Sequence, residues 1–130
     1  MRILVIRTDK PVAELYIYEN GKKRAGLKWQ AHRQLAETIH RQIDKILNKS
    51  SISVNEIDGI VCYKGPGSFT GLRIGLSVAN SLAHAVNIPL AARGGGGWVQ
   101  AGIDDLAAGK NDRIALPEYG APANTTPPKK

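Results

Sequence analysis

The chain has 130 residues, which gives room for one domain with a modest hydrophobic core and not for two full domains. Hydrophobic residues make up 42% of it, as in ordinary globular proteins, and its one cysteine, Cys62, excludes an internal disulfide and a cysteine-based zinc cluster. The 18 Lys and Arg against 11 Asp and Glu give a formal net charge of +7, which favours nucleic acid or an acidic protein surface as a partner. The apolar stretches are too short to cross a bilayer, so we expect a cytoplasmic protein that makes no membrane contact.

Three strands are predicted to open the chain. Residues 3–6 form a short apolar run, which is typical of a strand buried on both faces. Residues 12–19 and 24–29 alternate apolar and polar side chains, as strands with one buried face do. Asn20-Gly21 between them tolerates positive φ and is a strong signal for a hairpin. We therefore expect three antiparallel strands.

Two helices alternating with two strands follow. Apolar residues at helical spacing predict helices over residues 32–48 and 68–86. Apolar runs predict strands over residues 57–63 and 88–92. This order predicts an α/β fold consisting of a single actin-like or ribonuclease H-like half-domain. Its mixed five-stranded sheet would begin with three antiparallel strands and continue with parallel strands joined by helical crossovers.

The character of the sequence changes after residue 93. Residues 94–97 are four glycines, which are costly to order and indicate a hinge or linker. Residues 98–108 fit one short helix, and the end is rich in proline (Pro117, Pro122, Pro127 and Pro128), which predicts an extended tail that is mobile unless docked. We therefore divide the chain into a half-domain, residues 1–93, and a glycine-rich linker, short helix and proline-rich tail, residues 94–130.

A glycine-rich turn joins the fourth strand to the second helix. The conformational freedom of the glycines, the stiffness of the proline and the serine at the helix N-cap position predict a structural turn built from Gly65, Pro66, Gly67, Ser68 and Gly71. Such a turn before a helix N-terminus also suits an anion, but it is not followed by the Gly-Lys-Ser or Gly-Lys-Thr of a nucleotide-binding P-loop. These residues favour a structural turn over a phosphate site.

The helix after this turn has an unusually wide apolar surface. At about 100° per residue its apolar side chains span an arc of roughly 200°, more than one core contact requires. A ridge of small residues, Gly75, Ala79 and Ala83, would let another backbone approach closely. We therefore expect another protein chain to cover part of this helix.

The run from Gly65 to Gly75, with residues 76–83 after it, closely resembles the signature of the TsaB family, also called YeaZ. The similarity covers residues 1–92, and residues 116–122 resemble the proline- and tyrosine-containing end of family members. The second half-domain of the family is absent from this sequence. The resemblance implies a shortened actin-like fold with a role in making threonylcarbamoyladenosine in tRNA.

What the resemblance implies is a non-catalytic subunit of the tRNA modification complex. It would bind and support a TsaD-type catalytic subunit through its helices, with a TsaE-type ATPase joining the complex and tRNA as an indirect or shared ligand. A homodimer through the same surface would compete with the heterodimer. The interface residues implied on the second helix are Leu72, Arg73, Leu76, Ala79, Asn80 and Ala83.

One segment departs from the family pattern. Many relatives have Asp-Thr-Ser after the first strand, where an active actin-like ATPase handles phosphate and metal. This chain has Arg7 at the first of these positions, which removes the carboxylate and argues against nucleotide hydrolysis. Arg7 and Lys10 together would instead attract an anion.

Three other function classes fit the residues less well. A ribonuclease H-like nuclease needs carboxylates that converge on two metal ions, and Glu37 and Asp58 are better explained as a solvated helix residue and a turn residue. Cys62 lies in an apolar strand, and the histidines (His32, His40 and His84) show no triad or metal spacing, so we expect no catalytic residue, cofactor or metal site. The remaining alternative is a small basic module that binds RNA or another anion without a protein partner.

Overall fold

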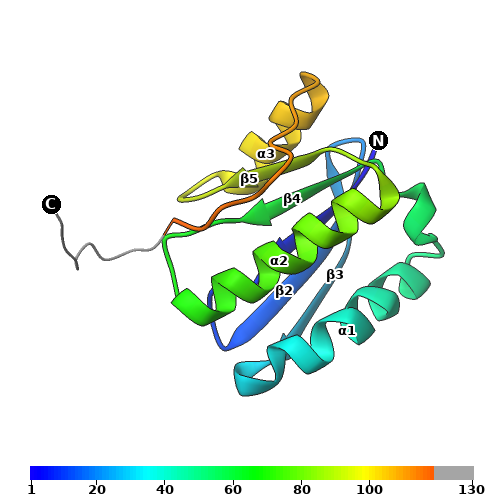
Figure 1. Cartoon of the computed structure of the whole chain (residues 1–130). Helices are drawn as coiled ribbons and strands as arrows, with labels where there is room; N and C mark the ends of the chain where they lie inside the picture. The colour runs from blue at the N-terminus through cyan, green and yellow to red at the C-terminus, as the bar shows by residue number, and fades with distance from the viewer. Residues whose placement is uncertain (119–130) are drawn as a thin grey trace, which may run out of the picture.

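The computed structural model of the protein describes residues 1–118 and, within them, every side chain except those of His32 and Phe69. A five-stranded sheet carries helices on both of its faces (Figure 1). In chain order the elements are β1 (Arg2–Arg7), β2 (Val12–Glu19), β3 (Lys22–Gln30), the 3-10 turn η1 (His32–Gln34), α1 (Leu35–Lys49), the 3-10 turn η2 (Val54–Glu56), β4 (Gly59–Tyr63), α2 (Phe69–Val86), β5 (Leu90–Arg93) and α3 (Trp98–Ala107).

The sheet is mixed, and its strands lie in the order β3-β2-β1-β4-β5. β2 pairs antiparallel with both β1 and β3, whereas β4 pairs parallel with both β1 and β5. Asn20 and Gly21 adopt φ values of 53° and 82° in the β2–β3 hairpin, as the sequence predicts for this turn. The predicted α/β half-domain with a mixed five-stranded sheet is therefore confirmed.

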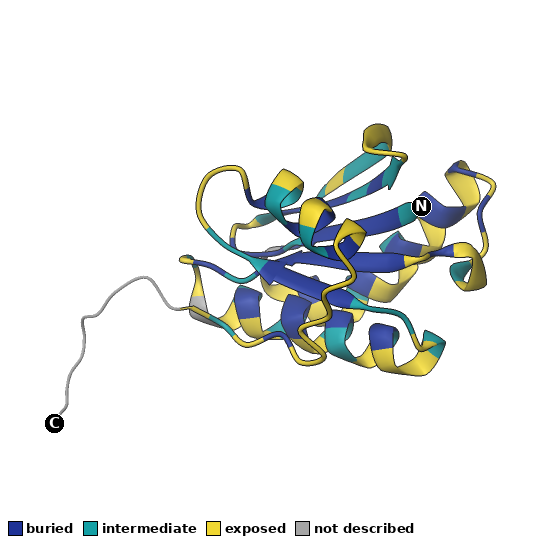
Figure 2. Ribbon diagram, turned by 90° about the horizontal axis from the view of Figure 1, so that it is seen from above, coloured by how far each residue is buried: buried dark blue, intermediate teal, exposed yellow. Residues whose placement is uncertain are grey.

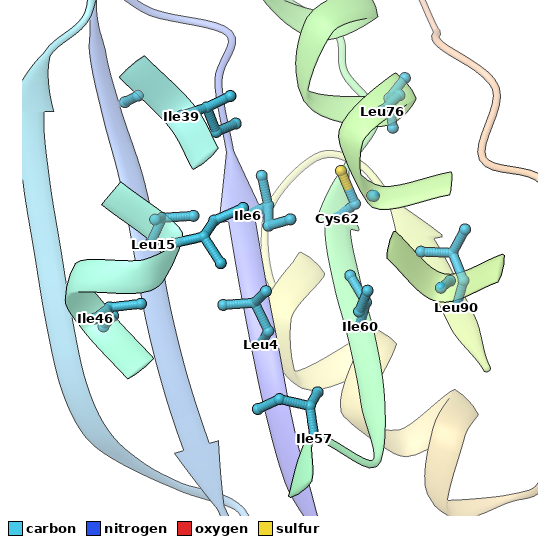
Figure 3. Packing of buried hydrophobic residues seen from close by; sticks show 14 of the residues in the cluster. Leu4, Ile6, Leu15, Ile39, Ile46, Ile57, Ile60, Cys62, Leu76 and Leu90 are labelled. Atoms are coloured by element: carbon cyan, nitrogen blue, oxygen red, sulfur yellow. The ribbon is translucent and has the colours of Figure 1, made fainter. Parts of the chain in front are cut away.

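Two hydrophobic clusters hold the layers together. The larger one lies between the sheet and the helices α1 and α2, and Figure 3 shows Ile39 and Ile46 of α1 next to Leu15 and Leu4 of the strands. The smaller one lies on the opposite face of the sheet, under α3. Each fully buried Leu or Ile contributes about 1.5–3 kcal/mol relative to an exposed one. In Figure 2 the helices are buried on the side that faces the sheet and exposed on the other.

The boundaries of the elements differ from the predicted ones by one to two residues at most ends and by three at the start of α1. Residues 32–34, predicted as the first turn of that helix, form a separate 3-10 turn. Gln34 stands at the N-cap of α1 and makes no side-chain capping hydrogen bond. The sequence thus has no capping residue that marks the N-terminus of α1. The prediction relied on apolar spacing alone, and it placed the start of the helix three residues too early.

Helix α3 packs on the second face of the sheet. Trp98, Ile103 and Leu106 are buried there, and the Trp98 ring meets the Tyr63 ring edge-on at 5.3 Å. An ion pair between Arg93 Nε and Asp105 Oδ2, 2.6 Å apart, ties the helix to the end of β5. A domain boundary after residue 93 stays a prediction, although α3 shares its hydrophobic cluster with β1, β4 and β5.

The segment after α3 runs along the outer edge of β5. The Leu90 N–H donates to Asn111 Oδ1 (3.1 Å), and the Ala92 N–H donates to Asp112 Oδ2 (2.8 Å). β5 is an edge strand, so these N–H groups have no neighbouring strand to pair with. These two side chains, together with the Asp112 N–H that donates to the Leu90 carbonyl (2.8 Å), thus take the place of a sixth strand.

Part of the predicted tail lies outside the described residues. Pro117 belongs to the described segment, while Pro122, Pro127 and Pro128 do not. The predicted glycine hinge forms the turn before α3, with Gly95 and Gly97 at φ values of 72° and 71°. Within residues 1–118, no helix combines the length and the apolar character that a membrane span requires.

Candidate functional site

The glycine-rich turn brings the N-terminal half of α2 into direct contact with the end of β1. A Cβ atom on Gly71 would collide with the carbonyl oxygen of Thr8, and one on Gly75 would collide with the Thr8 hydroxyl. The Thr8 hydroxyl donates a hydrogen bond to the Gly71 carbonyl (2.7 Å). These glycines therefore allow a close approach that any side chain would prevent. The sequence did not single out Thr8, because its partner is 63 positions away.

The start of the turn is equally tight. Gly65 has a φ of +124°, and a Cβ on it would collide with the carbonyl oxygen of Glu118. Gly67 lies against Asp9, whose side chain is the nearest neighbour of a Cβ built there. Ser68 occupies the N-cap position of α2, but its side chain makes no capping hydrogen bond, and its N–H donates to the Asp9 carbonyl (3.4 Å). The turn is thus held by backbone contacts rather than by the predicted serine cap.

Replacing Gly71 by alanine is expected to lower the free energy of unfolding by about 1–3 kcal/mol, since the added methyl group meets the backbone of Thr8. The matched control is Gly96→Ala, because a Cβ on Gly96 meets nothing within 4 Å and Gly96 has no positive φ. Urea unfolding of both variants measures the difference. Equal stability of the two variants would show that α2 moves away from β1 without cost.

Arg7 is bound by its neighbour Asp9 rather than left open to an anion. Its Nε and Nη2 atoms donate to the two carboxylate oxygens of Asp9 at 2.7 and 3.2 Å. This hydrogen-bonded pair raises the pKa of Arg7. The guanidinium also lies 4.1 Å from the ring centre of Tyr63, whose hydroxyl donates to the Pro66 carbonyl (2.8 Å). Lys10 is exposed, and an anion held by Arg7 and Lys10 stays a prediction, because Asp9 already accepts the hydrogen bonds of the guanidinium.

Four of the six predicted interface residues on α2 are buried in the core of the chain itself. Leu72, Leu76, Ala79 and Ala83 have exposed fractions of 0%, 2%, 0% and 5%. The prediction that these side chains offer a contact surface is corrected by this burial. The small residues of α2 let the helix approach the sheet at close range.

The other two predicted residues lie at the surface. Arg73 is exposed and, with His40, lines a hollow between α1 and α2. Asn80 is half-buried and holds the backbone of Ala115 with both atoms of its amide. Its Oδ1 accepts the Ala115 N–H (2.6 Å), and its Nδ2 donates to the Ala115 carbonyl (3.1 Å). Asn80 therefore docks the C-terminal segment of its own chain.

A groove runs between α1 and α2 on the face that points away from the sheet. On the α2 side it is lined by three half-buried apolar residues one turn apart, Ile74, Val78 and Leu82. Its two hollows have volumes of ≈ 430 and ≈ 400 Å³. His40 of α1 lies at the junction of the two hollows and Ser81 lines the second. The sequence did not single out this groove, although the wide apolar arc of α2 was a signal for it.

The nucleophile and acid–base candidates do not converge. Cys62 is 1% exposed, and its burial raises the pKa of the thiol to about 12. Glu37 is exposed on α1, while Asp58 accepts the Arg2 N–H (2.7 Å) at the start of β1. The side chain of His32 lies outside the described ones. Within the described residues, no three His, Cys, Asp or Glu side chains gather as a metal site would require.

Comparison with known proteins gives a consistent result. The family model described as "TsaD: tRNA N6-adenosine threonylcarbamoyltransferase" matches residues 29–92. Two curated proteins named tRNA threonylcarbamoyladenosine biosynthesis protein TsaB are similar over 90 residues, 69% of this chain. The one from Haemophilus influenzae is 30% identical, and the one from Escherichia coli is 32% identical. The chain spans 38% of the length of each.

A solved structure shares the fold. The structure described as YeaZ from Pseudomonas aeruginosa superposes with a TM-score of 0.67 at 24% sequence identity. The superposition covers 72% of this chain and 43% of that one. The curated matches and the shared fold agree with the glycine-rich signature before α2. The chain therefore belongs to the TsaB/YeaZ family.

Proposed function

We propose that the chain is a non-catalytic subunit of the machinery that makes threonylcarbamoyladenosine in tRNA, and that it binds a TsaD-type catalytic subunit. The observation that carries this proposal is the groove between α1 and α2, whose apolar ridge is Ile74, Val78 and Leu82. Support comes from the curated relatives, which are named as biosynthesis proteins for this nucleoside.

The groove has the composition of a protein contact rather than of a small-molecule site. Apolar side chains line its floor, and polar ones such as Arg73, Ser77 and Asp44 stand at its rim. An apolar centre surrounded by a polar rim is the usual anatomy of a protein–protein interface. A helix of a partner laid along α1 and α2 would bury the half-exposed ridge and leave the rim in contact with water.

The non-catalytic part of the proposal rests on the end of β1. At the position where an actin-like ATPase would place a carboxylate the chain has Arg7, and the positive charge of Arg7 is bound by Asp9. The one thiol of the chain, on Cys62, is buried in the sheet. In this proposal the chemistry belongs to the TsaD-type partner, and this chain supports that partner.

The rest of the proposed assembly follows from the same role. A TsaE-type ATPase would join the complex, tRNA would be a shared ligand, and the complex would work in the cytoplasm. The groove is also a surface through which two copies of the chain would pair. A homodimer is then the competing state of the heterodimer.

The experiment is to mix the purified chain with the TsaD-type protein of the same organism and to determine the masses of the products by light scattering. We expect a one-to-one complex. Ser81→Arg places a long charged side chain in the groove at an exposed position, so it is expected to weaken association at least tenfold, or about 1.4 kcal/mol, without unfolding the chain.

The matched control is Gln100→Arg, which adds the same charge at an exposed position of α3, on the opposite face of the sheet. This variant is expected to bind the partner as the unchanged chain does. A chain that stays monomeric or self-paired beside the TsaD-type protein would contradict the proposed function. Equal weakening by both arginine variants would contradict the groove as the interface.

A further inference from the structure

The positive charge of the chain is concentrated in one segment. Residues 22–49, which form β3, η1 and α1, contain eight Lys or Arg and only two Asp or Glu, so they carry six of the seven net positive charges. Residues 90–118, at the opposite edge of the sheet, contain three basic and four acidic residues. All eight basic side chains of the first segment are exposed: Lys22, Lys23, Arg24, Lys28, Arg33, Arg41, Lys45 and Lys49.

The fold places two rows of these charges along the same edge of the sheet, although Lys23 and Lys28 point to the face under α3, where Lys23 lies over the Tyr16 ring and Lys28 lies opposite Glu14. One row follows the edge strand β3, and the other follows α1 through Arg41, Lys45 and Lys49, which recur every four residues, or about 6 Å along the helix. Three contacts bind the two rows together. Lys49 Nζ donates to the Gly26 carbonyl (3.4 Å), Trp29 Nε1 to Thr38 Oγ1 (3.0 Å), and Arg24 Nη2 to the Ser50 carbonyl (3.1 Å).

The α1 row faces away from the groove between the helices. Thr38 and Lys49, which contact β3, lie on the same helical stripe as Arg41 and Lys45 by their spacing of three and four residues. The residues of α1 that line the groove are others, among them His40 and Leu47. We call the surface formed by Lys22, Lys23, Arg24, Lys28, Arg41, Lys45 and Lys49 the basic edge.

Most charges of the basic edge are not neutralised by the protein. Within residues 1–118, only Arg24 of these seven forms an ion pair, to Glu19 at 2.6 Å. Elsewhere in the chain arginines are paired with carboxylates: Arg2 with Glu56 and Arg93 with Asp105. Carboxylates are present beside the basic edge as well, since Glu14 lies opposite Lys28 and Glu19 opposite Lys22 in the sheet, but among the described residues only Glu19 forms an ion pair with it. The charge of the basic edge is left for a ligand from solution.

The side chains around the basic edge favour a phosphate backbone over unstacked bases. The segment of residues 22–49 has one aromatic residue, Trp29, which is half-buried and whose indole N–H is bonded to Thr38. The Tyr16 ring nearby lies 5.0 Å from Lys23 Nζ. A platform for single-stranded nucleic acid offers aromatic rings on which bases stack, and this surface offers lysines and arginines instead.

Protection of an edge strand explains only part of this pattern. Lysines on an edge strand discourage pairing with another sheet, which accounts for Lys22, Lys23 and Lys28 on β3. It does not account for Arg41 and Lys45, which are on a helix. The other edge, β5, is protected without lysines, by the side chains of Asn111 and Asp112.

We infer that the basic edge binds the phosphate backbone of a structured RNA, through the lysines of β3 and the basic row of α1. The groove between α1 and α2 stays free when RNA lies on this surface, because the two are on different sides of α1. The inference deepens the proposed function by giving the chain its own RNA contact. It takes from that function only the choice of tRNA as the probe.

The experiment measures binding of the full chain to an unmodified tRNA transcript by fluorescence anisotropy at several salt concentrations. One variant carries Lys22→Gln, Lys23→Gln and Lys28→Gln, and a second carries Arg41→Gln, Lys45→Gln and Lys49→Gln. The control carries Lys64→Gln, Lys110→Gln and Arg113→Gln, which remove the same charge near the opposite edge of the sheet. Each of the first two variants is expected to bind more weakly and to reduce the slope of log Kd against log salt by about one for each phosphate that the variant no longer neutralises.

The control is expected to keep a slope within about one of the unchanged chain. Equal weakening in all three variants would overturn the inference, because binding would then follow net charge and not the basic edge. Absence of tRNA binding at low salt would overturn it as well. Competition by polyglutamate as strong as that by tRNA would assign the surface to an acidic protein and overturn the commitment to RNA. None of these outcomes bears on the complex with the TsaD-type protein, which is measured without RNA.

Discussion

Replacing Leu76 by arginine is expected to prevent the chain from folding. Leu76 is 2% exposed and lies in the cluster between α2 and the sheet, above Cys62 (Figure 3). Truncating a buried leucine to alanine costs about 2–5 kcal/mol, and the total stability of a small domain is about 5–15 kcal/mol. Arginine removes the same packing and adds a charge with no partner in the core, so its cost is larger still.

The matched control is Ser77→Arg, one position further along α2, because Ser77 is exposed. That variant is expected to stay within about 0.5 kcal/mol of the unchanged chain. Circular dichroism shows whether Leu76→Arg is folded, and urea unfolding compares Leu76→Ala with Ser77→Arg. A folded Leu76→Arg chain that only fails to bind its partner would return Leu76 to the interface and contradict its burial.

Removing the charge of Arg7 is expected to have the second largest effect. Asp9 is 8% exposed, and both of its carboxylate oxygens accept hydrogen bonds from Arg7. In Arg7→Met that buried carboxylate loses its partner, and breaking a buried ion pair in this way costs about 3–5 kcal/mol. We expect a value near the lower end of that range, because the Arg7 side chain is 21% exposed and water compensates part of the loss.

A second substitution separates the ion pair from simple packing. In Arg7→Met with Asp9→Asn the buried position no longer carries an unpaired charge, so part of the lost stability is expected to return. Urea unfolding of the two single variants and the double variant at pH 7 gives the coupling energy. A loss below about 0.5 kcal/mol in Arg7→Met would mean that the pair behaves like an exposed one.

The sequence was sufficient for the fold because its strongest patterns are local. The stripe of α1, which includes Leu35, Ile39 and Ile43, is narrow, and these residues are buried. The hairpin at Asn20-Gly21 follows from the backbone conformation that the two residues allow. In each case the periodicity or the turn chemistry of a few neighbouring residues decides the structure.

The groove between α1 and α2 could not be predicted in the same way. The apolar arc of α2 is wide enough for two contacts, and periodicity does not say which half faces the sheet. The sheet takes the half with Ala79 and Ala83, because small side chains let the helix come close, and the half with Val78 and Leu82 lines the groove. The contact of Asn80 with Ala115 could not be predicted for another reason, since the two residues are 35 positions apart in the sequence.

The hydrogen bonds along the outer edge of β5 affect how the whole chain meets other molecules. The outward N–H groups of Leu90 and Ala92 donate to the side chains of Asn111 and Asp112, on a segment that the Asn80 side chain holds in place. This segment satisfies the edge of β5 without adding a new strand. The edge therefore has fewer free backbone groups with which a strand of another molecule could pair. Residues 111–115 thus protect this edge of the sheet against the addition of a strand from another molecule. A chain that stopped at residue 110 would leave the Leu90 and Ala92 N–H groups without these partners, and we expect it to be prone to aggregation.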